Sequence, residues 1–190
     1  TPPRGFFIFC YYTAMRKVLP QSFFERDTLC VAEKLLGKYL VSTRGAEPIA
    51  PRITEVEAYD GPLDKASHAS RGRTPRTEVM FHSGGCWYVY LVYGMHHLLN
   101  VVTGPEAYPA AVLIRSVEGT EGPGRVGALF RIGTELYGKK ASKKSGLWVE
   151  DRGVVVPHSA IKKLPRIGVS YAGDWAEKPY RLSVDPSLFI

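Results

Sequence analysis

The chain has 190 residues, 45% hydrophobic and 23% charged, which is the composition of an ordinary globular protein able to bury one core. Its 25 basic residues outnumber its 18 acidic residues, and the net charge of +7 favours an anionic partner. The cysteines, Cys10, Cys30 and Cys86, are odd in number and have no CxxC spacing. The sequence therefore argues against a disulfide framework or a structural zinc site and fits a reducing compartment.

The first fourteen residues differ in character from the rest. Residues 5–14 are apolar but too few to cross a membrane, and they carry no clear small-residue cleavage site. Met15, followed by the sequence RKVLP, is in the position of a native start. We predict that residues 1–14 are a non-native or disordered extension and that residues 15–190 form a single domain without a membrane span.

A helix and a hairpin are predicted next. Asp27 is a candidate N-cap, and Gly37 stands where a glycine commonly follows the end of a helix. The apolar positions between them share one helix face: Val31, Ala32, Leu35 and Leu36. Residues 38–43 and 52–59 are predicted strands, and the turn residues between them predict a hairpin over 38–59.

The strand over 53–59 has the sequence ITEVEAY. Alternation places Ile53, Glu55, Glu57 and Tyr59 on one of its faces. Two carboxylates on one side of a half-buried strand are unusual, because an unpartnered buried charge is costly. Two interpretations stay open on the pattern alone: the glutamates line a site, or they edge a solvated face.

The loop over 61–81 is long, and long loops inside compact domains are usually functional. It contains His68 and then three arginines, Arg71, Arg73 and Arg76, separated by glycine and proline. Such a cluster suits phosphate contacts made from a shaped loop. A merely solvated basic loop has the same composition, and a lone histidine is more often structural than catalytic.

Residues 86–92 and 97–103 are predicted strands, and residues 93–96 between them predict a tight hairpin tip with Gly94 at the turn. Tyr93 and Met95 are out of place at such a tip unless something apolar receives them. A core strand with a stray aromatic residue at its end is the alternative. Alternation directs Tyr88, Tyr90 and Val92 to one face and Trp87, Val89 and Leu91 to the other.

The remaining predicted elements lie after residue 103. Residues 110–116 predict an apolar strand with Arg115 near its end, where an edge residue or an ion-pair partner is usual. The sequence GPGR over 122–125 precedes a short helical pattern, and a Gly-rich helix start can bind phosphate through backbone amides. Further strands are predicted over 148–156, 167–171 and 181–184, and residues 133–145 are assigned no role.

These motifs resemble the alkyladenine (3-methyladenine, or N-methylpurine) DNA glycosylase family, which excises damaged purines. The resemblance extends from about Leu19 to Val184 and rests on RITEVEAYDGPLDKASHASRGRTPRTEVMF, YVYLVYGMHHLLNVV, AAVLIRSVEG and GPGR, in this order. It implies an α+β fold: a single compact mixed domain with a curved, mainly antiparallel sheet and a protruding, DNA-inserting β-hairpin. It also implies a monofunctional base-excision repair enzyme that flips alkylated purines out of duplex DNA and hydrolyses the N-glycosidic bond.

The resemblance implies roles for individual residues. Glu57 matches the acid that activates the attacking water, and Arg115 matches a residue beside that water and the phosphate backbone. Tyr93 matches the residue that fills the gap left by the flipped nucleotide, with Met95 in the same tip. The base pocket is expected to comprise Tyr59, His68, Tyr90 and Asn100, of which Asn100 matches the residue that disfavours the exocyclic amine of guanine. Expected contacts with the DNA backbone are Arg71, Arg73, Arg76, Gly124 and Arg125, and neither a metal nor a cofactor is expected.

One departure from the family is the short connection over residues 116–122. The family members compared carry a basic segment of some two dozen residues there, a length implied by the resemblance. Here Ser116 to Glu121 alone joins the strand to the Gly-Pro-Gly turn. Either this lineage lost the segment, or residues are missing from the sequence.

Two other functions stay open. A glycoside hydrolase would use Glu55 and Glu57, but same-face neighbours on a strand point in parallel about 7 Å apart rather than flank a sugar. A catalytically inactive DNA-damage binder would share every surface feature with the enzyme. The expected partner is double-stranded DNA containing damaged purines, bound by a monomer that does not associate with membranes. The expected location is cytoplasmic, at the bacterial nucleoid, or nuclear in a eukaryote.

Overall fold

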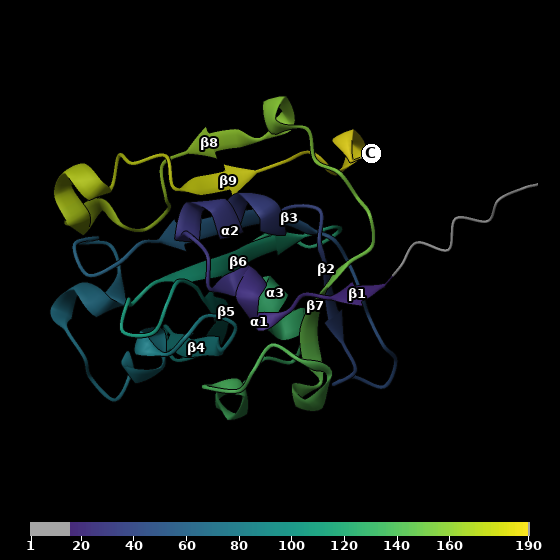
Figure 1. Cartoon of the computed structure of the whole chain (residues 1–190), viewed down its shortest axis with the longest axis horizontal. Coiled ribbons are helices and arrows are strands. Elements are labelled where there is room, and N and C mark those ends of the chain that lie inside the picture. Colours follow the sequence, from purple (N-terminus) through teal and green to yellow (C-terminus); the bar gives the residue numbers. More distant parts are fainter. Residues whose placement is uncertain (1–15, 190) are drawn as a thin grey trace, which may run out of the picture.

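Two antiparallel sheets form the framework of the protein (Figure 1). The computed structural model describes residues 16–189, so the predictions for residues 1–14 lie outside the described residues. The strands are β1 (Lys17–Val18), β2 (Tyr39–Ser42), β3 (Ile53–Tyr59), β4 (Trp87–Val92), β5 (His96–Val102), β6 (Ala111–Val117), β7 (Leu147–Asp151), β8 (Lys162–Leu164) and β9 (Arg181–Ser183). The α-helices are α1 (Gln21–Phe24), α2 (Thr28–Leu35) and α3 (Pro123–Leu129).

The strands pair in the orders β4-β5-β6-β3-β9-β8 and β1-β7-β2. Every pairing between these strands is antiparallel. The α+β prediction with mainly antiparallel sheets is therefore confirmed, with the strands divided between two sheets. No helix among residues 16–189 combines the length and the apolar character needed to cross a membrane.

The α2 helix forms as its sequence predicts. The Asp27 side chain accepts a hydrogen bond from the Cys30 backbone N–H at 2.9 Å, which satisfies one of the free amides at the helix start. Gly37 follows the helix with a φ of +78°, a conformation that residues with a Cβ rarely adopt. The helix packs its apolar face, including Val31 and Leu35, onto the six-stranded sheet.

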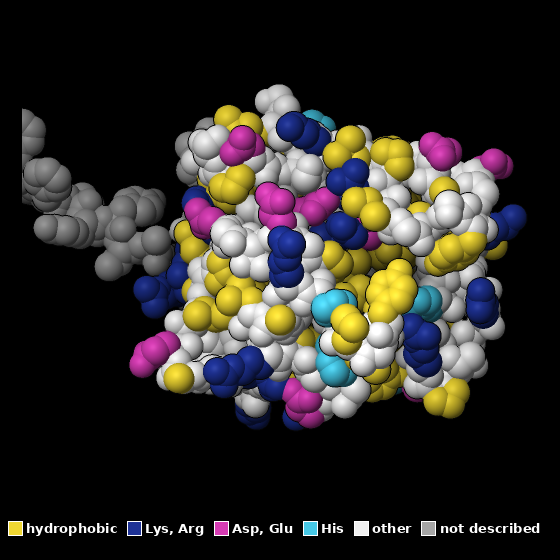
Figure 2. Space-filling model, turned by 180° about the vertical axis from the view of Figure 1, so that it is seen from behind, with side chains coloured by type: hydrophobic (Ala, Val, Ile, Leu, Met, Phe, Trp, Pro, Cys, Tyr) yellow, Lys and Arg dark blue, Asp and Glu magenta, His cyan; other side chains and the backbone are white. Residues whose placement is uncertain are grey.

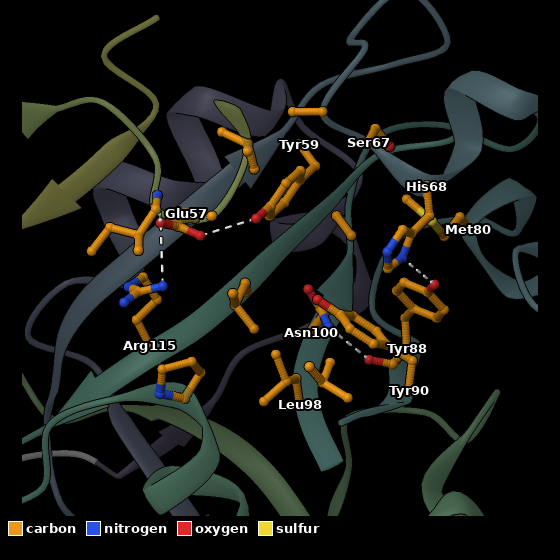
Figure 3. A pocket seen from close by; sticks show the side chains of 18 of the residues that line it. Glu57, Tyr59, Ser67, His68, Met80, Tyr88, Tyr90, Leu98, Asn100 and Arg115 are labelled. Atoms are coloured by element: carbon orange, nitrogen blue, oxygen red, sulfur yellow. Dashed lines mark hydrogen bonds and ion pairs between the residues drawn. The ribbon is translucent and has the colours of Figure 1, made fainter. Parts of the chain in front are cut away.

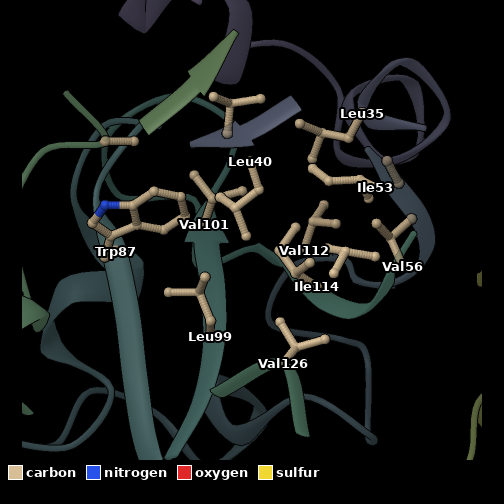
Figure 4. Packing of buried hydrophobic residues seen from close by; sticks show 14 of the residues in the cluster. Leu35, Leu40, Ile53, Val56, Trp87, Leu99, Val101, Val112, Ile114 and Val126 are labelled. Atoms are coloured by element: carbon tan, nitrogen blue, oxygen red, sulfur yellow. The ribbon is translucent and has the colours of Figure 1, made fainter. Parts of the chain in front are cut away.

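The main core lies against one face of the six-stranded sheet (Figure 4). Side chains from the sheet meet α2, α3 and the second sheet there: Leu35, Leu40, Ile53, Val56, Trp87, Leu99, Val101, Val112, Ile114 and Val126. Full burial of one such aliphatic side chain stabilises the fold by about 1.5–3 kcal/mol. The opposite face of the sheet carries a smaller buried cluster, which includes Tyr88, Val102 and Ala111, and the cavity described below opens beside it.

The predicted alternation of β4 is confirmed. Trp87 and Val89 belong to the main core, whereas Tyr88 and Tyr90 pack on the opposite face. The pairing of Val92 with His96 closes the hairpin, so its tip consists of residues 93–95. The side chains of Tyr93 and Met95 are 89% and 71% exposed, which shows that the tip protrudes from the rest of the fold.

The predicted face of Ile53 is wrong. The pairing of β3 with β6 shifts register between Ile53 and Val56, where two irregular steps interrupt the ladder. Such a bulge inserts a residue and reverses the alternation on one side of it. Ile53 therefore joins Val56 in the main core, while Glu55, Glu57 and Tyr59 keep the site face that alternation predicts.

Three other predicted strand regions differ from those in the structure. The region over 38–59 turns back on itself through the isolated bridges Tyr39–Arg52 and Ser42–Ile49, but β2 and β3 belong to different sheets. The strand predicted over 148–156 ends at Asp151. The strand predicted over 167–171 is wrong: a turn leads there into a 3₁₀ segment, Ser170–Trp175, because Gly168 adopts a φ of +78°.

Candidate active site

A cavity of about 580 Å³ opens on the sheet face opposite the main core (Figure 3). This volume is in the range of small-molecule sites, about 300–1,000 Å³. Its lining combines the strands β3 to β6 with the loop after β3 and with residues 167–171. The lining residues used below are Glu57, Tyr59, His68, Arg76, Tyr88, Tyr90, Tyr93, Asn100, Arg115, Ile167 and Tyr171.

Glu57 is fully buried yet lines this cavity. Its Oε2 accepts a hydrogen bond from the Tyr59 hydroxyl at 2.9 Å, and its Oε1 accepts one from the Ile167 backbone N–H at 2.8 Å. Arg115 Nη1 lies 3.3 Å from the same Oε1. A carboxylate held by two hydrogen-bond donors and one ion pair is fixed in orientation as an acceptor and as a negative charge.

Arg115 connects the two glutamates of β3. Its Nε lies 3.5 Å from Glu55 Oε1, and Glu55 also accepts hydrogen bonds from Arg181 Nη1 and Ser116 Oγ, both at 2.9 Å. Unlike Glu57, Glu55 does not line the cavity. The glycoside hydrolase alternative thus lacks its second carboxylate, and the pair of glutamates is balanced by a pair of arginines.

The wall facing Glu57 is aromatic. Burial raises the pKa of Tyr88 to about 12 and also raises the pKa values of Tyr59 and Tyr90, so these hydroxyl groups stay protonated. The rings of His68 and Tyr90 meet edge to face with centroids 4.6 Å apart. This arrangement brings together the base-pocket residues predicted from the sequence and adds Tyr88 to them.

His68 is neutral at ordinary pH. Burial, together with the positive charges of Arg76 and Arg71, lowers the pKa of its imidazole to about 4. Its Nδ1 lies 2.8 Å from the Tyr88 hydroxyl, which orients the ring. An uncharged, oriented imidazole serves as a wall and a hydrogen-bonding group rather than as a proton donor.

Asn100 forms part of the cavity floor. The side chain is buried, and its Nδ2 donates to the backbone carbonyl of Tyr88 at 3.1 Å, which fixes the amide group. Within residues 16–189, no group donates a hydrogen bond to its Oδ1. That oxygen is available to a molecule in the cavity.

The hairpin tip rises beside the cavity. Tyr93 and Gly94 have φ values of 53° and 68°, and for a bulky residue such as Tyr93 this conformation is an outlier. The turn therefore holds an exposed aromatic side chain outward at a cost in local strain. Figure 2 shows hydrophobic side chains and histidines gathered on one face of the molecule, with Lys and Arg side chains around them.

The loop arginines are not equivalent. Arg73 makes a two-pronged ion pair with Glu78, with N–O distances of 2.8 and 2.7 Å. The Arg76 guanidinium lies 5.2 Å from the Tyr90 ring centroid and lines the cavity. Arg71 is exposed and makes no ion pair within the described part of the chain.

The Gly-Pro-Gly turn lies beside the same strands. Gly124 packs against the His96 ring, where an added Cβ would meet a ring atom at 3.1 Å. The Gly122 N–H donates to Ser116 Oγ at 3.2 Å, so this amide is occupied. Arg125 is exposed and, among residues 16–189, has no carboxylate partner.

One wall of the cavity was missed by sequence reasoning. Residues 167–171 supply the amide that binds Glu57 and three further lining residues, Gly168, Val169 and Tyr171. The Tyr171 hydroxyl donates to the Ala66 carbonyl at 3.2 Å, which ties this segment to the loop after β3. The glycine inside the segment was a signal against a strand, but nothing in the pattern indicated which group would meet Glu57.

The site is thus a cavity with a buried carboxylate and an aromatic wall, next to a hairpin tip that exposes Tyr93. The family model described as methylpurine-DNA glycosylase matches residues 22–121 and 118–187 of the chain. The chain belongs to the methylpurine-DNA glycosylase family. It is a DNA glycosylase, a hydrolase of N-glycosyl bonds that acts in the repair of alkylated DNA, and the resemblance found in its sequence is confirmed.

Bacterial relatives named "Putative 3-methyladenine DNA glycosylase" are similar over most of their length. The relative from Myxococcus xanthus (strain DK1622) is 48% identical over 179 residues, which cover 90% of this chain and 92% of the relative. The relative from Anaeromyxobacter dehalogenans (strain 2CP-C) is 44% identical over 185 residues, covering 90% and 86%. That from Legionella pneumophila (strain Corby) is 43% identical over 183 residues, covering 93% and 98%.

The short connection after β6 is shared with at least one relative. The two matches to the family model meet at residues 118–121, at the point where the longer segment was expected. The alignment with the Legionella relative nevertheless spans 98% of that protein in 183 positions, 93% of this chain. These shares leave no room for an extra two dozen residues in the relative, so the segment is absent from both proteins.

Proposed function

We propose that this glycosylase extrudes an alkylated purine of the 3-methyladenine type from double-stranded DNA into the cavity and hydrolyses its glycosidic bond with a water molecule oriented by Glu57. The observation that carries the proposal is the Glu57 carboxylate, buried and held by two hydrogen-bond donors and one arginine at the side of a cavity that has an aromatic wall. A glycosylase must remove its target from the base stack, because the bond is inaccessible within a duplex.

The hairpin tip suits the extrusion step. Unstacking and unpairing a nucleotide costs a few kcal/mol, and an apolar side chain placed in the gap offsets part of that cost. Tyr93 is 89% exposed and held outward by the turn, and Met95 is exposed next to it. We assign Tyr93 to the vacated position in the stack and Met95 to the neighbouring base step.

The aromatic wall suits a purine, and a cationic purine best. Tyr59 and Tyr90 line the cavity, and an alkylated purine with a positive charge gains attraction from π systems. The free Asn100 Oδ1 is a hydrogen-bond acceptor at the cavity floor. We assign it the discrimination between purines that differ in their exocyclic groups.

The chemistry assigns one role to each charged group. As the bond between C1′ and the base nitrogen lengthens, positive charge develops on the sugar, and the Glu57 carboxylate stabilises it. Water attacks C1′, its proton passes to Glu57, and the base leaves with the bonding electron pair. Arg115 keeps the carboxylate oriented and presents a positive charge toward the DNA strand.

The neutral state of His68 supports the choice of substrate. Because burial lowers the pKa of His68 to about 4, this imidazole is uncharged at neutral pH and is a poor acid for protonating a departing base. A purine alkylated at N3 or N7 is already cationic and leaves as a neutral molecule without being protonated. The site therefore suits cationic alkylpurines better than bases that leave as anions.

The same lining supports a monofunctional enzyme. A glycosylase with lyase activity forms a Schiff base through an amine, and among residues 16–189 no lysine lines the cavity. We propose that the enzyme acts as a monomer and leaves an intact abasic site.

A product assay tests the proposal. Duplex DNA treated with a methylating agent is incubated with the enzyme, free bases are separated by chromatography, and a parallel sample is treated with borohydride. We expect free methylated purine, strand breaks only after alkali, and no covalent adduct. Tight binding without base release would identify a damage binder, and a trapped adduct would refute the water mechanism.

A further inference from the structure

A buried ion pair lies directly behind the cavity. Arg166 and Asp64 have no exposed side-chain surface, and the guanidinium makes a two-pronged contact with the carboxylate, with Nη2 at 2.8 Å from Oδ1. Neither residue lines the cavity. Burial of two charges is expensive, and such a pair contributes little stability compared with apolar residues of similar size. Its presence therefore calls for a role other than stabilisation.

The pair holds together the segments that surround Glu57. Arg166 also donates to the backbone carbonyls of Ala58 at 2.8 Å and of Trp175 at 3.0 Å. Asp64 accepts hydrogen bonds from the backbone N–H groups of Asp60 and Ala66 at 3.0 and 3.1 Å. One end of β3, the loop after it and the segment over 166–175 are thus fixed to a single charged pair.

Both hydrogen-bond donors to Glu57 depend on this pair. Ile167, whose N–H donates to Oε1, is the next residue after Arg166. The Arg166 guanidinium carbon lies 4.9 Å from the ring centroid of Tyr59, whose hydroxyl donates to Oε2. A shift of Arg166 would therefore move the donors on both carboxylate oxygens.

We propose that Arg166 and Asp64 are positioning residues for the glycosylase reaction, which hold the Ile167 amide and the Tyr59 hydroxyl on the two oxygens of Glu57. The inference rests on the proposed role of Glu57 as the group that orients water. The carboxylate has no freedom to rotate while the pair is intact. Without the pair, Glu57 stays in the cavity but loses its fixed direction toward the sugar.

The test uses a double variant, because removing one partner leaves an uncompensated buried charge and is expected to unfold the protein. Asp64→Asn with Arg166→Met removes both charges and keeps one side-chain oxygen, which can still accept from one of the two amides, that of Asp60 or that of Ala66. We expect a thermal midpoint and a DNA dissociation constant close to those of the wild type. Single-turnover excision should fall by about a hundredfold, the loss that a small misplacement of a reacting group causes.

Two controls separate positioning from general disturbance. Glu150→Gln with Arg152→Met removes another ion pair, in which Arg152 Nη2 lies 2.8 Å from Glu150 Oε2 and both side chains are largely buried. Neither residue lines the cavity, so excision should stay at the wild-type rate. Adding the Asp64 and Arg166 changes to Glu57→Gln should cause no further loss, since groups that act through one residue are not additive. An additive loss would mean a structural role and overturn the proposal.

The outcomes also separate this inference from the proposed function. A wild-type excision rate in the Asp64 and Arg166 double variant, with Glu57→Gln inactive, would overturn the positioning role alone. A wild-type rate in Glu57→Gln would overturn the proposed function itself. Arg166→Lys, which keeps the charge but cannot reach both carbonyls and the carboxylate together, should have an intermediate excision rate.

Discussion

The cavity has two walls that differ in how they are built. The hairpin of β4 and β5 supplies Tyr88, Tyr90 and Asn100 from regular strands, and Tyr93 from its tip. The segment over 166–175 supplies a backbone amide, two glycine turns and Tyr171 from an irregular loop. In the proposed function the first wall meets DNA and a base, whereas the second wall holds the Glu57 carboxylate through the Ile167 amide.

This difference assigns separate steps to the two walls. Changes in the hairpin should affect extrusion and recognition, and so depend on whether the substrate is paired. Changes near Glu57 should affect bond cleavage on every substrate. Each expectation below tests that separation.

The largest effect is expected at Glu57, which the second wall holds and which acts on a base bound by the first wall. Glu57→Gln keeps the size of the side chain but removes the general base and the negative charge, so single-turnover excision should fall by about 10²–10⁴-fold. Binding to damaged duplex should remain within a few-fold of wild type. Glu55→Gln is the matched control on the same strand, and a larger loss in that variant would reverse the two assignments.

The hairpin wall is tested by Tyr93→Ala. Excision from duplex DNA should fall by about tenfold to a hundredfold, since the wedge offsets part of an extrusion cost of a few kcal/mol and each 1.4 kcal/mol is a factor of ten. Excision from a single strand should change little, while the Asp64 and Arg166 double variant should lose activity equally on both substrates. Tyr93→Leu keeps an apolar wedge and serves as the control.

The thermal unfolding midpoint of Tyr93→Ala should be measured alongside its excision rates. Tyr93 is 89% exposed, so its loss removes little core burial and should leave the unfolding temperature unchanged. A fall in that temperature, or equal losses of activity on duplex and single strand, would show that Tyr93 packs in the fold rather than enters the duplex.

Much of the hairpin wall could be predicted from the sequence because its signals are local. Alternation in β4 directed Tyr88 and Tyr90 away from the core, and Gly94 marked the turn that exposes Tyr93. The helix cap at Asp27 followed from neighbouring residues for the same reason. Local signals failed at Ile53, where a bulge that no residue announces reverses the alternation.

The second wall could not be predicted, because its chemistry comes from groups that the sequence does not mark. Every residue except proline carries a backbone N–H, so the identity of residue 167 does not indicate that its amide binds a carboxylate 110 positions away. Arg166 and Asp64 are 102 positions apart and look like ordinary surface charges in the sequence. Their partnership appears only when the chain folds.

A smaller effect is expected at the loop arginines. Arg71→Ala and Arg76→Ala should each flatten the log–log dependence of binding on salt by up to about one unit, because each lost phosphate contact releases fewer counterions. Arg73→Ala should change the slope less, since Glu78 already holds that guanidinium. Equal slopes in all variants, measured by anisotropy titration, would mean that the loop does not contact phosphate.

The smallest effect concerns pH. Because burial lowers the pKa of His68 from 6.5 to about 4, the neutral form is favoured in the folded protein. The stability that depends on it is complete above pH 6.5 and is lost as the pH falls toward about 4. In urea unfolding, His68→Gln should reduce the pH slope of stability in this window by up to about one proton, and an unchanged slope would contradict the assignment.

The most direct test of the account is a crystal structure of the enzyme on duplex DNA that contains 3-deaza-3-methyladenine, an analogue with a stable glycosidic bond. We expect the base in the cavity against Tyr59 and Tyr90, a water molecule between Glu57 and C1′, and Tyr93 in the vacated position of the stack. A base that stays within the duplex, or one bound in the cavity with C1′ directed away from Glu57, would contradict the account.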